Sequence, residues 1–126
     1  MAGALILVVE DNEKNLKLFR DVLQAQGFET VEATTADEAV EAALRHEPDL
    51  VLMDIQLPGA DGVEALARLR ADDRTAAMQV LAITALAMDG DRNRFLEAGF
   101  DGYLSKPVDI ADLVDAVTQH CEAGEG

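Results

Sequence analysis

Three short runs of consecutive apolar residues constrain the fold of this chain more than any other feature. They cover residues 5–9, 50–53 and 80–83. A strand in which every residue is apolar is typical of a parallel sheet with helices on both faces. Between the runs, apolar residues recur at i, i+3 and i+4, which is the spacing of amphipathic helices. The sequence therefore predicts an α/β domain.

The alternation continues along the chain and predicts five strand–helix units. The expected strands cover residues 5–9, 28–33, 50–54, 80–84 and 102–105. The expected helices cover residues 12–26, 35–47, 62–71, 89–98 and 109–121. Asn12, Thr35 and Asp109 stand at helix starts, where their side chains can cap free backbone amides. In the last helix, the residues expected to face the core are Ile110, Leu113, Val114 and Val117.

Five such units with short connections predict one doubly wound, five-stranded parallel sheet flanked by five helices, a three-layer sandwich. With the flavodoxin-like strand order 2-1-3-4-5, the first and third strands are neighbours. Ligands of such sheets bind beyond the carboxyl ends of the strands, where the strand order reverses. The residues that follow the first and third strands are therefore the first candidates for a functional site.

Polar residues stand at these strand ends: Glu10 and Asp11, Asp54, Thr84 and Lys106. Taken singly, each has an ordinary structural explanation, such as a helix cap, a strand-end threonine or a solvated lysine. Together they supply three carboxylates, which favour a hard cation such as Mg²⁺. An aspartate can act as a nucleophile in phosphoryl transfer, which needs mainly positioning and electrostatic stabilisation. The set predicts a metal-assisted phosphoryl-transfer site.

Composition limits the classes of partner and compartment. The formal net charge is −15 over 126 residues, so the surface repels nucleic acids and anionic lipids. A single cysteine, Cys121, excludes an internal disulfide and fits a reducing cytoplasm. No apolar run is long enough for a membrane span. We expect a cytoplasmic protein.

Four motifs follow one another along the chain: VEDN at residues 9–12, LMDIQLPGADG at 52–62, AITA at 82–85 and KP at 106–107. They resemble the motifs of the receiver domains of two-component response regulators. The resemblance covers essentially the whole chain, and the spacing between the motifs also matches. The acidic pair is Glu-Asp where Asp-Asp is commoner, which leaves the metal geometry as the main open point.

The resemblance implies a role for each motif residue. Asp54 matches the phosphoacceptor. Asp11 matches a direct Mg²⁺ ligand, Glu10 a ligand acting through water, and Gln56 the residue whose backbone carbonyl completes the metal shell. Lys106 matches the lysine that pairs with the phosphate, and the Lys106–Pro107 bond is expected to be cis.

Two further positions match the parts that respond to phosphorylation. Thr84 matches the switch hydroxyl that moves toward the phosphoryl group, and Tyr103 matches the aromatic residue whose ring orientation follows it. The expected donors are a sensor histidine kinase or a histidine phosphotransfer protein. The expected output is a protein partner at the face of the fourth helix, fifth strand and fifth helix.

The resemblance thus implies a signalling module that modifies itself, not an enzyme for outside substrates. We expect one receiver domain over residues 1–126, with its core at about 4–121, no effector domain, and a monomer or weak dimer.

One alternative is an aspartyl-phosphate phosphatase of the haloacid-dehalogenase type. That chemistry needs an acid two residues after the nucleophile, where this chain has Gln56. The other is a flavodoxin-like cofactor binder, but the acidic residues after the first run would repel a phosphate without a metal.

Overall fold

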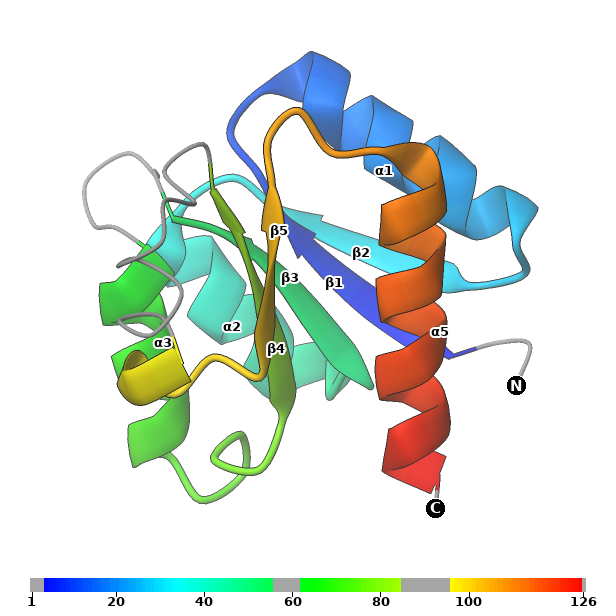
Figure 1. Cartoon of the computed structure of the whole chain (residues 1–126). Coiled ribbons are helices and arrows are strands. Elements are labelled where there is room, and N and C mark those ends of the chain that lie inside the picture. Colours follow the sequence, from blue (N-terminus) through cyan, green and yellow to red (C-terminus); the bar gives the residue numbers. More distant parts are fainter. Residues whose placement is uncertain (1–3, 56–61, 85–95, 126) are drawn as a thin grey trace.

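The computed structural model describes residues 4–55, 62–84 and 96–125, and shows one five-stranded parallel sheet (Figure 1). The strand order is β2-β1-β3-β4-β5, as the sequence predicts, and each neighbouring pair is parallel. The strands are β1 (Leu5–Val9), β2 (Glu29–Ala33), β3 (Leu50–Asp54), β4 (Gln79–Thr84) and β5 (Gly102–Ser105).

Burial separates the three inner strands from the two edges. Every residue of β3 is buried, and β1 and β4 each have only their first residue partly exposed. In contrast, β2 and β5 are mostly half-buried or exposed. The continuous apolar runs are therefore the strands covered on both faces, because only those positions need apolar side chains throughout.

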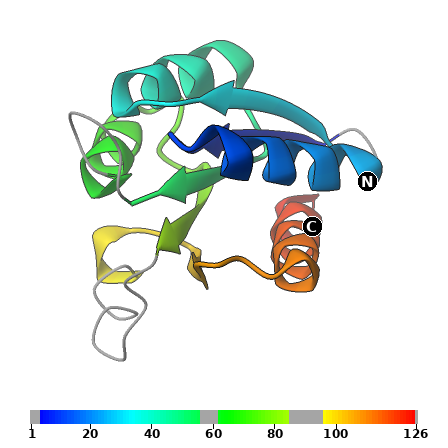
Figure 2. The same ribbon diagram turned by 90° about the horizontal axis from the view of Figure 1, so that it is seen from above.

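Helices cover both faces of the sheet (Figures 1 and 2). The helices are α1 (Glu13–Ala25), α2 (Ala36–His46), α3 (Gly62–Ala71) and α5 (Ile110–Glu125). One core layer joins α1 and α5 to residues such as Val8 and Leu52, and the other joins α2 and α3 to Val9 and Met53. Successive strand residues thus face opposite layers, as the pleat requires.

Local hydrogen bonds fix the predicted helix starts. The Asn12 side chain accepts from the backbone amides of Lys14 and Asn15, at 3.0 and 3.1 Å. The Thr35 hydroxyl accepts from the Glu38 amide at 3.1 Å, and Asp109 Oδ1 accepts from the Ala111 amide at 2.8 Å. These caps satisfy amides that the helices leave without a partner.

The structure corrects two expectations about the last helix. Ile110 does not face the core: its exposure is 51%, whereas Leu113 and Val117 are buried and Val114 is half-buried. The helix also continues to Glu125, beyond the expected end near Cys121. The predicted helix at residues 89–98 lies largely outside the described residues. Among the described residues, no helix has the length and apolar character that a membrane crossing requires.

Candidate functional site

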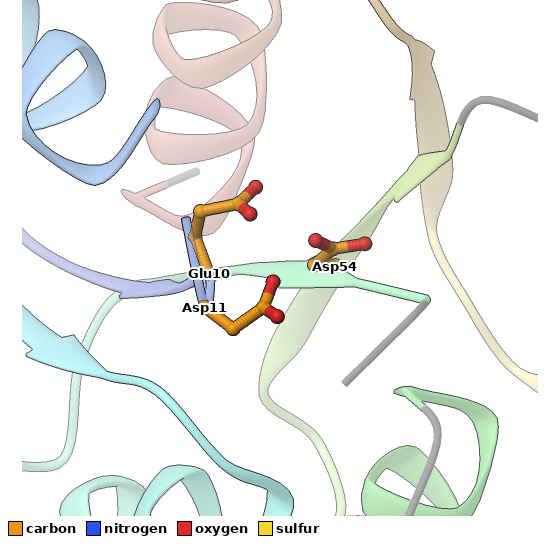
Figure 3. Close-up of side chains that lie close together, drawn as sticks. All are labelled: Glu10, Asp11 and Asp54. Carbon is orange, nitrogen blue, oxygen red and sulfur yellow. The ribbon is translucent and has the colours of Figure 1, made fainter. Parts of the chain in front are cut away.

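The carboxylates of Glu10, Asp11 and Asp54 converge at the carboxyl end of the sheet (Figure 3). One oxygen from each lies within 4.8 Å of the others. The sheet register explains this, because Val9 of β1 pairs with Met53 of β3, so that the next residue of each strand stands at the same level. The side chains differ in exposure: Glu10 and Asp54 are buried, at 0% and 2%, and Asp11 is exposed.

Lys106 reaches this cluster from the end of β5. Its Nζ lies 2.8 Å from Asp54 Oδ2 and 3.2 Å from Glu10 Oε2. The Lys106 backbone amide donates to the Thr84 carbonyl at 2.8 Å, and the Lys106–Pro107 peptide bond is cis, as expected. The lysine is thus held by its backbone beside β4 while its ammonium contacts two of the three carboxylates.

The charges of the cluster are not balanced. Burial of Glu10 and its contact with Asp54 raise the pKa of Glu10 to about 7, although the Asn12 amide and Lys106 act in the opposite direction. Burial disfavours the Lys106 ammonium, but its contacts with Asp54 and Glu10 outweigh this and raise the pKa of Lys106. Two buried carboxyl groups, those of Glu10 and Asp54, therefore share one ammonium.

The donor set fits a hard divalent cation. Glu10 Oε2 is buried and has no partner with hydrogen-bond geometry among the described residues, although Lys106 Nζ is near. Carboxylate oxygens on a partly open site are the ligands that Mg²⁺ takes, usually together with water. A cation there would favour the ionised form of Glu10, whose pKa is raised by burial and by the contact with Asp54.

Thr84 and Tyr103 lie on the two strands next to the cluster. Thr84 ends β4 and is buried, and it pairs with Ser105 of β5. Tyr103 is half-buried in β5, opposite Ala82.

The structure thus brings Glu10, Asp11, Asp54 and Lys106 together, with Thr84 on the strand between Asp54 and Lys106. Gln56 lies outside the described residues.

Gly62 is a site residue whose part the sequence reasoning missed. A Cβ at this position would collide with the carbonyl oxygen of Asp54. The Gly62 amide also donates to the Ile55 carbonyl at 2.8 Å, which holds the first turn of α3 against the end of β3. Only a glycine permits this approach, so Gly62 helps to position Asp54. The signal was present, since Gly62 closes the motif at residues 52–62.

Comparison with protein families gives a match over most of the chain: the response regulator receiver domain family matches residues 6–118. The chain belongs to this family. Among its relatives, the polar-differentiation response regulator DivK of Brucella anthropi is 42% identical over 115 residues, which are 91% of this chain and 94% of that protein. DivK of Brucella ovis is 41% identical over the same length.

Solved receiver structures share the fold. A putative response regulator from Chloroflexus aurantiacus has a TM-score of 0.89 and 28% identity, covering 95% of this chain and 98% of that chain. The receiver domain of a sensor histidine kinase from Pseudomonas aeruginosa has a TM-score of 0.88 and 35% identity, covering 96% and 99%. That structure has a magnesium ion coordinated in its active site cleft. The receiver domain described here is therefore a module of two-component signalling.

Proposed function

We propose that this receiver domain accepts a phosphoryl group on Asp54 and that the resulting aspartyl phosphate changes which protein it binds. One observation carries the proposal: Asp54 is 2% exposed and lies beside both Lys106, at 2.8 Å, and the acidic pair Glu10-Asp11. The donor is a histidine kinase or a histidine phosphotransfer protein of the same signalling system, and we place the reaction in the cytoplasm.

The site supplies the nucleophile and the ammonium for the transfer, and the donor supplies the phosphoryl group. An Asp54 carboxylate oxygen forms the new O–P bond while the P–N bond of the donor's phosphohistidine breaks. The donor imidazole keeps the electron pair of that bond and takes up a proton. Lys106 contacts Asp54 Oδ2 before transfer, so its ammonium is already placed to pair with a phosphoryl oxygen afterwards.

Mg²⁺ is the proposed cofactor, and Glu10, Asp11 and Asp54 are the side chains that would hold it. We infer that the Gln56 backbone carbonyl contributes a further ligand. Bound at these oxygens, the cation would neutralise charge on the carboxylate and on the incoming phosphoryl group. Support comes from the donor chemistry of the cluster and from the Pseudomonas aeruginosa receiver, which coordinates magnesium in its cleft.

Thr84 and Tyr103 are the proposed readout. The Thr84 hydroxyl can donate a hydrogen bond to a phosphoryl oxygen, since it ends the strand between Asp54 and Lys106. Tyr103 lies on the adjacent strand, opposite Ala82, and reaches toward the surface next to α5. The phosphoryl charge would thus bias a protein-binding face that includes β5 and α5, together with the segment before β5.

The domain is proposed to act as one unit, with its core at about residues 4–121, as a monomer or weak dimer. We expect no turnover of outside substrates. A phosphatase of the haloacid-dehalogenase type is less favoured, because Gln56 stands where that chemistry needs an acid. The family match also favours the receiver over this alternative.

Intact-mass analysis with acetyl phosphate and Mg²⁺ tests the phosphoacceptor. Wild type should gain one phosphoryl group, Asp54→Asn none, and the exposed control Asp73→Asn as much as wild type. A histidine phosphotransfer protein loaded with phosphate should give the same pattern. Labelling of Asp54→Asn, or no labelling of wild type by either donor, would overturn the proposal.

A further inference from the structure

We propose that the groove between β5 and α5 binds a basic segment of a partner protein, one with lysine or arginine side chains alternating with apolar ones. The inference deepens the proposed function, because this groove lies on the face assigned there to the output partner. It names the chemistry of that partner, which the family match leaves open.

The groove has a volume of about 540 Å³, and its lining presents more polar than apolar surface. Its apolar part comes mainly from Leu104 of β5, Val108 of the following turn and Ala116 of α5, which pack against the α1–α5 core layer, and Tyr103 also lines the groove. In addition, β5 is the last strand of the sheet and has a strand neighbour on one side only within the described fold. A groove with apolar side chains beside a sheet edge offers a bound segment both side-chain contacts and backbone partners.

Carboxylates alone provide the charge of this groove. Asp109, Asp112 and Asp115 line it, and no lysine or arginine does among the described residues. The three are spaced by three residues along the chain, so they follow one side of the start of α5 and repel one another. None of them makes an ion pair with a described residue, whereas other surface acids such as Glu32 and Asp37 do.

The acidity is not shared by the groove on the other side of the 106–108 turn. That groove has a volume of about 390 Å³ and is lined by Lys106, with no carboxylate among its described lining residues. The two neighbouring grooves therefore differ in their charged lining, with three aspartates in one and Lys106 in the other.

Charge complementarity selects the occupant. A basic segment would relieve the repulsion among the three aspartates while its apolar side chains cover Leu104 and Val108. A second copy of this chain is a poor occupant, because a symmetric contact would bring the same acidic rim against itself. The occupant we infer is thus a segment of another protein.

Tyr103 provides a reporter for the groove, because it is the only tyrosine of a chain without tryptophan. The probe is a synthetic peptide of alternating lysine and leucine, and the readout is Tyr103 fluorescence during titration of the full chain. The comparison peptides replace every lysine by glutamine or by glutamate. We expect the lysine peptide to bind most tightly, the glutamate peptide not to bind, and added salt to weaken binding.

A pair of double variants separates the groove from the overall charge. Asp112→Asn with Asp115→Asn removes two charges from the rim, and Glu29→Gln with Asp73→Asn removes two exposed charges elsewhere. The rim pair should weaken binding of the lysine peptide roughly fivefold, and the control pair less than about twofold. Circular dichroism checks that both pairs keep the helical content of wild type.

Three results would overturn the proposal. They are equal weakening by both variant pairs, tighter binding of the glutamine peptide than of the lysine peptide, and concentration-dependent dimers that the rim pair alters. The titration uses the unphosphorylated wild-type chain, so it does not depend on transfer of a phosphoryl group to Asp54. Failure of Asp54 labelling would therefore leave this measurement interpretable, and failure of the titration would leave the phosphoacceptor assignment standing.

Discussion

The two ends of the sheet both enclose charged groups, but they balance them in different ways. At the amino ends of β4 and β5, Arg70 of α3 donates hydrogen bonds to the backbone carbonyls of Ala76 and Gly99, at 3.0 and 2.8 Å. It also donates to the Met78 carbonyl and to Asp101 Oδ2. One guanidinium thus joins α3 to the two segments that lead into β4 and β5.

Asp101 completes this amino-end network. Its Oδ2 accepts from the Val80 amide at 2.7 Å and from Arg70 at 3.1 Å. Every charge here has an opposite charge and hydrogen-bond partners. At the carboxyl end, three carboxyl groups converge, of which Asp54 and Glu10 contact Lys106, and Glu10 Oε2 has no partner with hydrogen-bond geometry among the described residues.

The difference separates a polar network that stabilises the fold from one that is available for chemistry. A satisfied network rigidifies the segments it joins, whereas an unbalanced cluster of like charges costs stability until a cation or a proton enters it. Removal of a charged side chain should therefore lower the free energy of unfolding at the amino end and raise it at the carboxyl end.

Loss of Arg70 should have the largest effect on stability. Arg70→Met would leave three carbonyls without their donor and Asp101 without its ion pair, so we expect the free energy of unfolding to fall by about 2–4 kcal/mol. Urea denaturation measures this change. Arg68→Met is the matched control on the same helix, because within the described part of the chain Arg68 makes only the exposed pair with Asp37, so the variant should cost less than about 1 kcal/mol. Equal losses in the two variants would contradict the contrast between the ends.

Arg70 also marks where sequence reasoning stops. The inner strands and helix starts could be predicted, because continuous apolar runs and caps such as Asn12 act over a few residues. Nothing local distinguishes Arg70 from Arg68, since the partners of Arg70 include Gly99 and Asp101, which are distant in sequence. Its role depends on how the loops meet in space.

The site was predictable for a different reason. Parallel strands bring their carboxyl ends to one edge, so Glu10 and Asp54 could be placed together from topology alone. Periodicity was less informative about Ile110, because it gives the side of a helix that faces inward but not how far the covering layer extends. Ile110 begins α5 and is 51% exposed, while Leu113, one turn later, is buried.

At the carboxyl end, neutralising a charged side chain should raise the stability of the metal-free protein instead of lowering it. In metal-free protein, the pKa of Glu10 is raised from 4.5 to about 7, so the folded state holds this proton more tightly than the unfolded state. That stabilisation is present below the unfolded pKa and is lost as the pH rises through the folded pKa. Wild type should therefore lose stability between about pH 5 and about pH 8, and Glu10→Gln should lose less.

Thermal unfolding in EDTA across this pH range measures the effect. At about pH 8, Glu10→Gln should be more stable than wild type by about 1–2 kcal/mol, since it removes one buried like charge. Added Mg²⁺ should stabilise wild type and narrow or reverse that difference. Glu29→Gln, an exposed control, should follow the wild-type curve. If Glu10→Gln declined in parallel with wild type, Glu10 would not carry the unbalanced charge.

The smallest effect on stability should come from a glutamine–histidine pair at the amino end. Gln79 Nε2 donates to the His120 backbone carbonyl at 2.9 Å, and Gln79 Oε1 lies 2.7 Å from His120 Nδ1. This pair joins the start of β4 to α5, so Gln79→Ala and His120→Ala should each lower the free energy of unfolding by about 1 kcal/mol. Because the two residues contact each other directly, the double variant should lose less free energy of unfolding than the sum of the two single losses.

The control is Gln119→Ala, at an exposed neighbouring position, which should change the free energy of unfolding little. Additive losses would show that the two side chains stabilise the amino end separately and not as the pair that the distances indicate.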